Sequence, residues 1–257
     1  MDEDSFRKLF DLSGRTAIVT GGTRGIGLAI AEGFACAGAN LVVASRKPEA
    51  CEQAAARLRE LGAQAVGVPT HLGEIDSLRA LVDTAVSAFG GIDIVVNNAG
   101  IAPLAPNLAA VGEGLWDKTL EVNLKGPFRL MAVAGARMAA AGGGSIVNIS
   151  SIGAERPSPP EAMYAAAKNG LNALTRAFAQ EYAPTVRVNC VMPGGFATDM
   201  AEHWDEEFVG KIVDRLPAGR LGRPEEIAGI VVHLASDAAG YTTGALIPVD
   251  GGRTAVY

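Results

Sequence analysis

The chain has 257 residues and a mass of 26.4 kDa, and 49% of its residues are apolar, which excludes a disordered chain and allows a large core. Its formal net charge of −6 argues against a nucleic-acid binder, because such proteins usually carry a basic domain or patch. Three widely spaced cysteines fit neither a disulfide framework nor a zinc site, so we expect a reducing, cytoplasmic compartment and no bound metal. The sequence also lacks a signal peptide and a run of about 18 apolar residues, which argues against a membrane protein.

Short apolar runs alternate with longer helical stretches along the whole chain. The predicted strands are Thr16–Thr20, Asn40–Ala44, Ala63–Val68, Ile92–Asn97, Ser145–Ser150, Val186–Met192 and Ala245–Val249. The main predicted helices are Pro48–Leu61, Ile75–Phe89, Leu115–Ala140, Glu161–Tyr182 and Pro224–Ala235, besides one that follows the first strand. Continuous apolar strands, rather than alternating ones, indicate a sheet that is buried on both faces.

This alternation predicts an α/β protein with a single Rossmann-fold domain over residues 1–257. We expect a doubly wound, seven-stranded parallel sheet with helices on both faces. Residues from about 10 to 110 should form mainly the cofactor half, and residues from about 111 to 257 the catalytic and substrate half.

The first predicted strand ends in a glycine-rich turn, TGGTRGIG at residues 20–27, and a helix follows. Glycine allows positive φ angles and close approach of a ligand to the backbone. The start of a helix presents free N–H groups that suit a pyrophosphate. A plain strand-to-helix turn is the alternative, but a glycine cluster at this place favours a dinucleotide site. Its G-x-x-x-G-x-G spacing differs from the ordinary G-x-G-x-x-G fingerprint.

That spacing resembles the TGxxxGxG turn of the classical short-chain dehydrogenases/reductases, and further motifs match that family in order along almost the whole chain. The matching motifs are Asn97-Asn98-Ala99-Gly100, Asn123, Ser151, Tyr164-Ala165-Ala166-Ala167-Lys168, Pro193-Gly194, Thr198 and Asp250-Gly251-Gly252. The resemblance implies hydride transfer between a nicotinamide cofactor and a ketone or secondary alcohol. The residues expected at the cofactor are Gly21, Thr23, Arg24, Gly25, Ile26, Gly27, Ser45, Arg46, His71, Leu72, Asn98, Ala99, Gly100, Tyr164, Lys168, Pro193, Gly194, Phe196 and Thr198.

The end of the second predicted strand bears on the choice of cofactor. An NAD site usually carries an acidic residue about 20 positions after the glycines, but this segment reads Ser45-Arg46-Lys47. Arg46 can bind a 2′-phosphate through charge-assisted hydrogen bonds, and Arg24 can approach from the other side. We therefore predict NADP(H), with NAD(H) as the alternative cofactor; two solvated surface arginines are the competing interpretation.

One position departs from the family pattern. Family members often carry an aspartate beside the adenine after the third strand, whereas this chain has Thr70-His71-Leu72 there. His71 can hydrogen-bond the base or merely pack near it.

Tyr164 and Lys168 are four residues apart in a predicted helix, so they share one face. A surface Tyr/Lys pair is the alternative, but Ser151 at the end of the fifth predicted strand favours a catalytic set. The reference pKa of tyrosine is about 10, and a charge at roughly 5 Å in an effective dielectric of about 20 contributes about 3 kcal/mol. We therefore expect Lys168 to lower the pKa of Tyr164 by roughly 2 pH units.

The resemblance assigns a role to each member of this set. Tyr164 is the general acid and base, Ser151 holds the substrate oxygen, and Lys168 also binds the nicotinamide ribose. Asn123 is expected to position a water relay to the lysine, with an internal helix hydrogen bond as its alternative role.

The substrate is less well indicated. Met192 and the segments Gly153–Pro160 and Ala201–Arg215 should line a moderately apolar pocket. The stretch at residues 217–228 is similar to 3-oxoacyl-carrier-protein reductases, but the loop at residues 138–144 lacks the basic residues that an acidic carrier protein would need.

The segment at residues 70–73, THLG, is instead similar to NADP-dependent carbonyl reductases, so we favour a carbonyl reductase with a small-molecule ketone or alcohol substrate. A 3-oxoacyl-carrier-protein reductase, with acyl carrier protein as a less favoured partner, is the first alternative. A catalytically silent nucleotide sensor or scaffold is the second, and the complete catalytic set argues against it.

Two predicted helices, Leu115–Ala140 and Glu161–Tyr182, are rich in alanine and other small residues. Packing on their own sheet explains this composition, but small residues also allow helices of two subunits to approach closely. Family members commonly form tetramers through these helices, so we expect a homotetramer, with Gly251–Tyr257 near a second interface.

Overall fold

The computed structural model describes residues 1–198 and 206–256 of the chain. Within these residues, seven parallel strands form one sheet in the order β3-β2-β1-β4-β5-β6-β7. The strands are β1 (Thr16–Thr20), β2 (Asn40–Ser45), β3 (Ala65–Pro69), β4 (Ile94–Asn97), β5 (Gly144–Ile149), β6 (Val186–Pro193) and β7 (Leu246–Val249). The predicted fold class is therefore confirmed, including the change of direction in strand order at β1 and β4 where doubly wound folds bind ligands.

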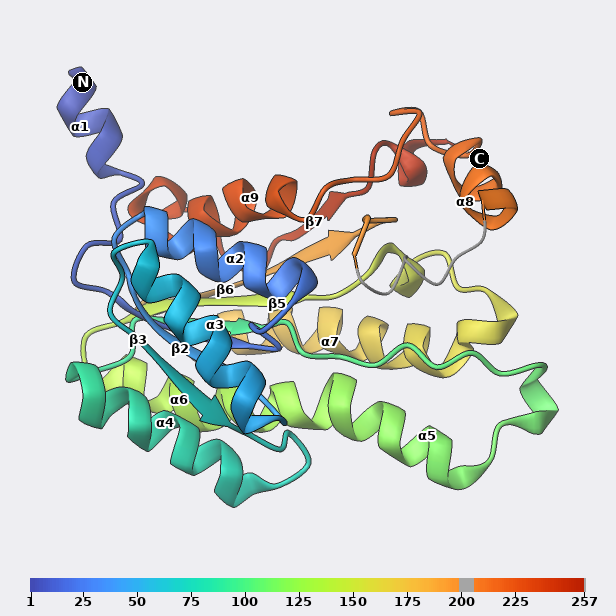
Figure 1. Cartoon of the computed structure of the whole chain (residues 1–257), viewed down its shortest axis with the longest axis horizontal. Coiled ribbons are helices and arrows are strands. Elements are labelled where there is room, and N and C mark those ends of the chain that lie inside the picture. Colours follow the sequence, from blue (N-terminus) through green and yellow to red (C-terminus); the bar gives the residue numbers. More distant parts are fainter. Residues whose placement is uncertain (199–205, 257) are drawn as a thin grey trace.

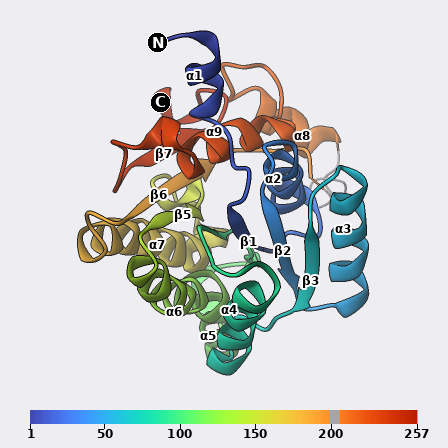
Figure 2. The same cartoon turned by 90° about the vertical axis from the view of Figure 1, so that its left-hand side faces the viewer.

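Helices cover both faces of this sheet (Figures 1 and 2). On one face lie α2 (Gly25–Cys36), α3 (Pro48–Glu60) and α9 (Glu225–Ala235), and on the other lie α4 (Ile75–Phe89), α6 (Gly126–Ala140) and α7 (Ala162–Glu181). Successive residues of β1 serve the two sides in turn: Val19 belongs to the first core and Ile18 to the second. All five residues of β1 are buried, which explains why this strand is continuously apolar.

The remaining elements are short. They are the helices α1 (Glu3–Lys8), α5 (Glu113–Leu120) and α8 (Glu206–Val213), the π-helical turn η2 (Glu121–Lys125), and the 3₁₀ turns η1 (Leu108–Ala110), η3 (Ile152–Ala154), η4 (Pro159–Glu161), η6 (Asp237–Ala239) and η7 (Arg253–Ala255). The sequence did not predict α1 or α8. Among the described residues, no helix combines the length and apolar character that crossing a bilayer requires.

The prediction of one long helix at Leu115–Ala140 was wrong in one respect, because η2 divides this stretch into α5 and α6. Pro127 has no N–H to donate to the Asn123 carbonyl four residues earlier, so the regular α-helical ladder fails at this point. Single π-helical turns inside α-helices occur frequently at functional sites. This one contains Asn123.

Candidate active site

The carboxyl ends of the four central strands bring most of the predicted site residues to one edge of the sheet. The glycine turn follows β1, and Asn98 follows β4. Ser150 and Ser151 follow the end of β5, and Pro193 is the last residue of β6. Because parallel strands end at the same edge, segments that are far apart in sequence meet there.

The glycine turn is held against β4 by side-chain hydrogen bonds. Asn98 Nδ2 donates to the carbonyl oxygens of Thr20 at 3.0 Å and Gly21 at 3.1 Å. Thr20 Oγ1 accepts the N–H groups of Asn98 at 3.1 Å and Ala99 at 3.3 Å. The motif Asn98-Ala99 therefore fixes the shape of the turn.

Backbone conformation and close contacts restrict the glycines of the turn. Gly21 has a φ of 64° and Gly25 a φ of 52°, a region that other residues rarely adopt. A Cβ atom on Gly27 would collide with the Gly21 carbonyl and with Asn98 Nδ2. Helix α2 then begins without a side-chain cap, so its first N–H groups keep their capacity to bind an anion. These features fit the pyrophosphate of a dinucleotide.

Two arginines stand at this edge of the sheet, one before α2 and one after β2. The side chains of Arg24 and Arg46 are both exposed. Within the described chain, Arg46 forms no ion pair with a carboxylate. Since β1 and β2 are neighbours with matched ends, the geometry is compatible with two cations around one phosphate group.

The segment after β3 is more exposed than the rest of the site. The His71 side chain is 53% exposed, with Nδ1 at 3.8 Å from a Glu74 carboxylate oxygen, and its backbone N–H donates to Ser77 Oγ at 2.9 Å. Leu72 packs against Gly126 at the start of α6. The imidazole thus lies on the surface of the turn before α4.

Lys168 is anchored to the end of β5. Its Nζ donates a hydrogen bond to the Ile149 carbonyl at 2.8 Å, and Ser150 Oγ donates to the Lys168 carbonyl at 3.1 Å. The lysine is 3% exposed. These two bonds join α7 to the residues directly before Ser151.

Ser151, Tyr164 and Lys168 lie together. Lys168 Nζ is 5.7 Å from the centroid of the Tyr164 ring. Gly153 lies close to Ser151 and Tyr164, because a Cβ placed on it would be 3.3 Å from Ser151 Oγ and 4.0 Å from Tyr164 Cε1. Ser151 Oγ also accepts the N–H of Gly153 at 3.0 Å, which caps η3.

Burial, rather than mutual attraction, dominates the titration of this pair. Desolvation raises the pKa of Tyr164 to about 12, while its hydrogen bond with Ser151 works in the opposite direction. Desolvation lowers the pKa of Lys168 to about 8, against a smaller raising effect of Cys190. The expected lowering of the pKa of Tyr164 by Lys168 was wrong: the pKa is raised, because the charged form loses hydration in the interior.

Asn123 is fully buried in the π-helical turn. Its Nδ2 donates to the carbonyls of Ile101 at 2.8 Å and Thr119 at 2.9 Å, and its Oδ1 accepts the Ile101 N–H at 3.2 Å. The internal helix hydrogen bond is therefore present. Gly100 lies between Asn123 and Lys168, because a Cβ on it would be 2.7 Å from Asn123 Oδ1 and 3.6 Å from Lys168 Nζ.

Some residues of the segment after β6 lie in the core, and others lie near the candidate active site. The Phe196 ring is buried in the core, and the backbone next to it pairs with Gly222. Gly194 approaches Asp250, where a Cβ would come within 2.8 Å of the Asp250 Cα. Thr198 lies near the glycine turn, 3.6 Å from the position of a Cβ on Gly25.

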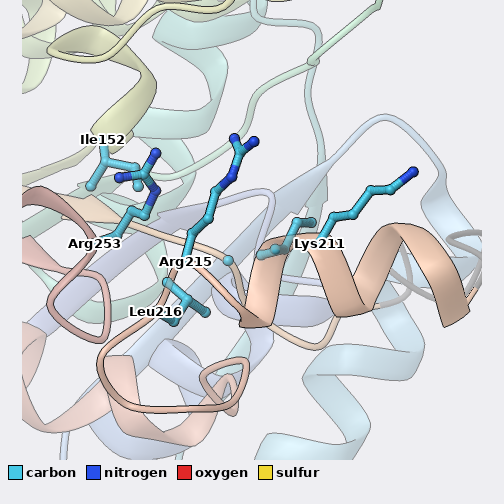
Figure 3. Close-up of a pocket in the computed structure, with 7 residues that line it drawn as sticks. Ile152, Lys211, Arg215, Leu216 and Arg253 are labelled. Carbon is cyan, nitrogen blue, oxygen red and sulfur yellow. The ribbon is translucent and has the colours of Figure 1, made fainter. Parts of the chain in front are cut away.

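A cavity of about 330 Å³ opens next to Ile152 (Figure 3). Its lining residues are Ile152, Gly195, Lys211, Ile212, Arg215, Leu216 and Arg253. Ile152 follows Ser151 directly in the chain. Part of the predicted segment Ala201–Arg215 thus lines the cavity, although residues 201–205 lie outside the described part of the chain. The predicted Met192 is buried, with Asn172 donating to its sulfur.

The predicted segment Gly153–Pro160 supplies none of the lining residues, and sequence reasoning missed Ile152, Leu216, Arg253 and Gly195. Arg253 follows the closing motif Asp250-Gly251-Gly252, and Gly195 follows Pro193-Gly194. In the sequence, their position directly after these motifs was the one indication that Arg253 and Gly195 could lie at the cavity.

A second cavity, of about 500 Å³, borders the glycine turn. It is lined by Gly25, Leu28, Ala29, Glu32, Arg57, Ala197, Thr198, Leu221, Pro224 and Glu225.

Comparison with known proteins gives consistent matches over nearly the whole chain. The profile of a family described as "Enoyl-(Acyl carrier protein) reductase" matches residues 21–254. The human "Dehydrogenase/reductase SDR family member 4" is 42% identical over 244 residues, covering 94% of this chain and 88% of that protein. "Cis-4-hydroxycyclohexanecarboxylate dehydrogenase" from Sinomonas cyclohexanicum is 41% identical over 244 residues, covering 94% of this chain and 97% of that protein.

Solved structures show the same likeness. A short-chain type dehydrogenase/reductase from Mycobacterium marinum superposes with a TM-score of 0.92 at 34% identity, covering 97% of this chain and 99% of that one. A gluconate 5-dehydrogenase from Burkholderia cenocepacia J2315, in complex with NADP and tartrate, gives a TM-score of 0.93 at 36% identity, covering 98% of this chain and 100% of that one.

Proposed function

Because the chain belongs to the classical short-chain dehydrogenase/reductase family, we propose that it is an NADP(H)-dependent carbonyl reductase whose general acid and base is Tyr164. Its family membership makes it an oxidoreductase that acts on an alcohol or carbonyl group with a nicotinamide cofactor. Residues from about 10 to 110 are assigned to the cofactor half, and those from about 111 to 257 to the catalytic half.

The observation that carries the proposal is the buried Lys168 held beside Tyr164 and Ser151. A bound nicotinamide supplies the hydride in reduction and accepts it in oxidation. The Ser151 hydroxyl donates a hydrogen bond to the substrate oxygen and holds it near the phenol. Tyr164 gives its proton to that oxygen as the carbonyl carbon becomes a carbinol carbon.

The charge of Lys168 stabilises the phenolate that remains after proton transfer. Since the pKa of Tyr164 is raised to about 12, the phenol is protonated near neutral pH, which is the form that reduction needs. A water relay to Lys168 runs past Asn123, whose amide is itself held by Ile101 and Thr119.

NADP(H) is favoured by the exposed Arg24 and Arg46 and by the lack of an acidic residue at the end of β2. The gluconate 5-dehydrogenase with a similar structure holds NADP, which is consistent with this choice. In the site, the glycine turn and Asn98 would hold the pyrophosphate end, and Tyr164 and Lys168 the nicotinamide end. We retain the sequence-based expectation of a cytoplasmic enzyme.

The test is the rate of NADPH oxidation with a ketone, compared between the wild type and Tyr164→Phe. We expect kcat to fall about 10²- to 10⁴-fold, the usual contribution of a positioned acid or base, while NADPH binding measured by fluorescence changes less than about threefold. An unchanged rate in Tyr164→Phe would remove the tyrosine from the mechanism. A wild type that binds NADPH but reduces no carbonyl compound would favour the nucleotide-sensor alternative.

A 3-oxoacyl-carrier-protein reductase remains the second candidate, because the matching family profile carries a carrier-protein description. The loop that follows α6, residues 141–143, contains no lysine or arginine that could receive an acidic carrier protein. Parallel assays with a free ketone and a 3-oxoacyl thioester separate the two functions. Preference for the thioester would overturn the assignment of a free ketone substrate.

A further inference from the structure

We infer that the cavity beside Ser151 binds a carboxylate of the substrate, so that the preferred substrates are oxo acids rather than neutral ketones. The inference rests on the proposed carbonyl reductase and names the substrate class of the same site.

The first observation is the charge of the cavity wall. Lys211, Arg215 and Arg253 are three of its lining residues, and none of the seven lining residues is acidic. The cations come from α8, from the turn after it, and from η7. Figure 3 shows the long side chains of Arg215 and Arg253 extending on the same side as Ile152.

The second observation is that the two arginines lack a carboxylate partner. Within residues 1–198 and 206–256, neither Arg215 nor Arg253 forms an ion pair. Lys211 is different, because its Nζ lies 2.6 Å from Glu207. The nearby acidic Asp214 and Glu155 form no ion pair with either arginine.

Eight other arginines of the described chain do have such a partner, whereas Arg46, Arg129, Arg156, Arg176 and Arg187 do not. The paired ones are Arg7, Arg15, Arg57, Arg59, Arg79, Arg137, Arg220 and Arg223. The two guanidinium groups at the cavity therefore keep their positive charge available to a ligand.

The third observation is that Arg253 is held in place relative to Ser151. The Asp250 carboxylate accepts the N–H groups of Gly252 at 2.9 Å and Thr254 at 2.7 Å, which fixes the turn on both sides of Arg253. Arg156, shortly after η3, donates to the Thr254 carbonyl at 2.9 Å. The anchor for an anion and the hydroxyl that holds the carbonyl oxygen thus belong to linked segments.

These observations define the chemistry of the ligand. A planar guanidinium binds a carboxylate through two parallel charge-assisted hydrogen bonds, and a second guanidinium adds to the attraction. The volume of about 330 Å³ suits a small organic acid. A substrate with its carbonyl at Tyr164 and a carboxylate a few bonds away would use both parts of the site.

The kinetic test uses matched pairs of substrates. The acids 4-oxopentanoate, 5-oxohexanoate and 6-oxoheptanoate are each compared with their methyl ester, with NADPH as reductant. In the wild type we expect kcat/KM for the best acid to exceed that of its ester at least 10-fold. Arg253→Gln and Arg215→Gln should each lower the value for the acid about 10- to 100-fold and leave the value for the ester within about twofold.

Arg79→Gln is the matched control. Arg79 is an exposed arginine on α4 that pairs with Asp76, and α4 lies on the opposite side of the molecule from α8 (Figures 1 and 2). Arg79→Gln should leave kcat/KM unchanged for both the acids and the esters. Equal kcat/KM values for acids and esters in the wild type, or an equal loss for both in the arginine variants, would overturn the inference while leaving the carbonyl reductase intact.

A binding experiment separates this inference from the proposed function. Hexanoate has no carbonyl group to reduce, and hexanamide is its neutral counterpart. By calorimetry, hexanoate should bind the wild type at least 10-fold more tightly than hexanamide, and Arg253→Gln should abolish the preference. If the enzyme reduces no acid and no ester, the proposed function fails and this experiment decides the inference. Equal binding of the two compounds, or no binding of either, would then overturn it.

Discussion

Tyr164 and Lys168 place a weak acid and a cation in the interior, where each charged form is disfavoured. Reduction needs the protonated phenol and the protonated amine together. Below the pKa of about 8 the lysine is charged, and the phenol stays protonated up to about pH 12.

We therefore expect kcat/KM for carbonyl reduction to be level below about pH 8 and to fall above it as Lys168 loses its proton. The pH profile of NADPH oxidation measures this. Lys168→Arg keeps its charge at high pH, so in that variant the falling limb should move upward even if the maximal rate is lower. A wild-type rate that rises between pH 8 and 10 would contradict this role of the lysine.

Arg46 is the residue on which the choice of cofactor depends most. Removing a charge-assisted hydrogen bond costs about 1.5 to 3 kcal/mol, or roughly 10- to 150-fold in binding. Arg46→Asp should lower kcat/KM for NADPH by about this factor and leave kcat/KM for NADH unchanged or higher. Steady-state kinetics with both cofactors, with Arg79→Gln as the control, give the comparison. Equal losses with NADPH and NADH would mean that Arg46 does not recognise the 2′-phosphate.

At the scale of elements, the π-helical turn joins α5 and α6 to the segment after β4 through a single amide. Asn123→Ala would leave the partly buried N–H and carbonyl of Ile101 without partners. Each such group costs about 1 to 3 kcal/mol, so we expect a loss of about 2 to 4 kcal/mol in the free energy of unfolding. Urea denaturation at a fixed protein concentration measures it.

Asn107→Ala is the control for this change. Asn107 Oδ1 accepts the Ala110 N–H at 3.0 Å on an exposed turn, so its loss should cost less than about 1 kcal/mol. If the two variants unfold at the same urea concentration, the bridge from Asn123 to Ile101 does not stabilise the fold as argued.

The elements also show what the sequence can predict. Strands such as Val186–Met192 are continuous apolar runs between helical stretches, and β6 was found at that place with one further residue. The catalytic residues lie beside strand ends, so Ser151, Tyr164 and Lys168 could be grouped from local order and family motifs. Their convergence was confirmed by the geometry, while their roles stay predictions.

Other features depend on contacts that a linear pattern does not display. The exact place of the π-helical turn depends on how the helix accommodates Pro127, and α8 was not predicted although Asp205-Glu206-Glu207 is a helix start signal. The pKa of Tyr164 depends on burial by surrounding elements, which the sequence estimate from the Lys168 charge alone did not include. Arg253 reaches the cavity only because the Asp250 turn folds back toward η3.

At the scale of the whole molecule, an exposed phenylalanine lies beside other aromatic rings on the surface of α6 and α7. Phe128 on α6 is 45% exposed, and its ring lies 5.6 Å from that of Phe178 on α7. Phe178 in turn contacts Tyr182, again with 5.6 Å between centroids. A partly exposed aromatic cluster across α6 and α7 suits contact with a second copy of the chain.

We expect the wild type to be a homotetramer and Phe128→Asp to shift it to smaller species, because the new charge would be buried in the interface. Light scattering coupled to size-exclusion chromatography measures the mass. Phe6→Asp, at a 51% exposed phenylalanine on α1, should leave the tetramer unchanged. A monomeric wild type, or a Phe128→Asp variant that stays tetrameric, would contradict this assembly.

The burial of Lys168 also bears on how such a protein evolves. A pKa lowered from 10.5 to about 8 means that folding disfavours the charged amine by roughly 3 kcal/mol below pH 8. The same residue therefore weakens the fold and supports turnover. Selection for heat resistance alone would favour an uncharged side chain at this position, and only continued selection for activity would preserve the lysine.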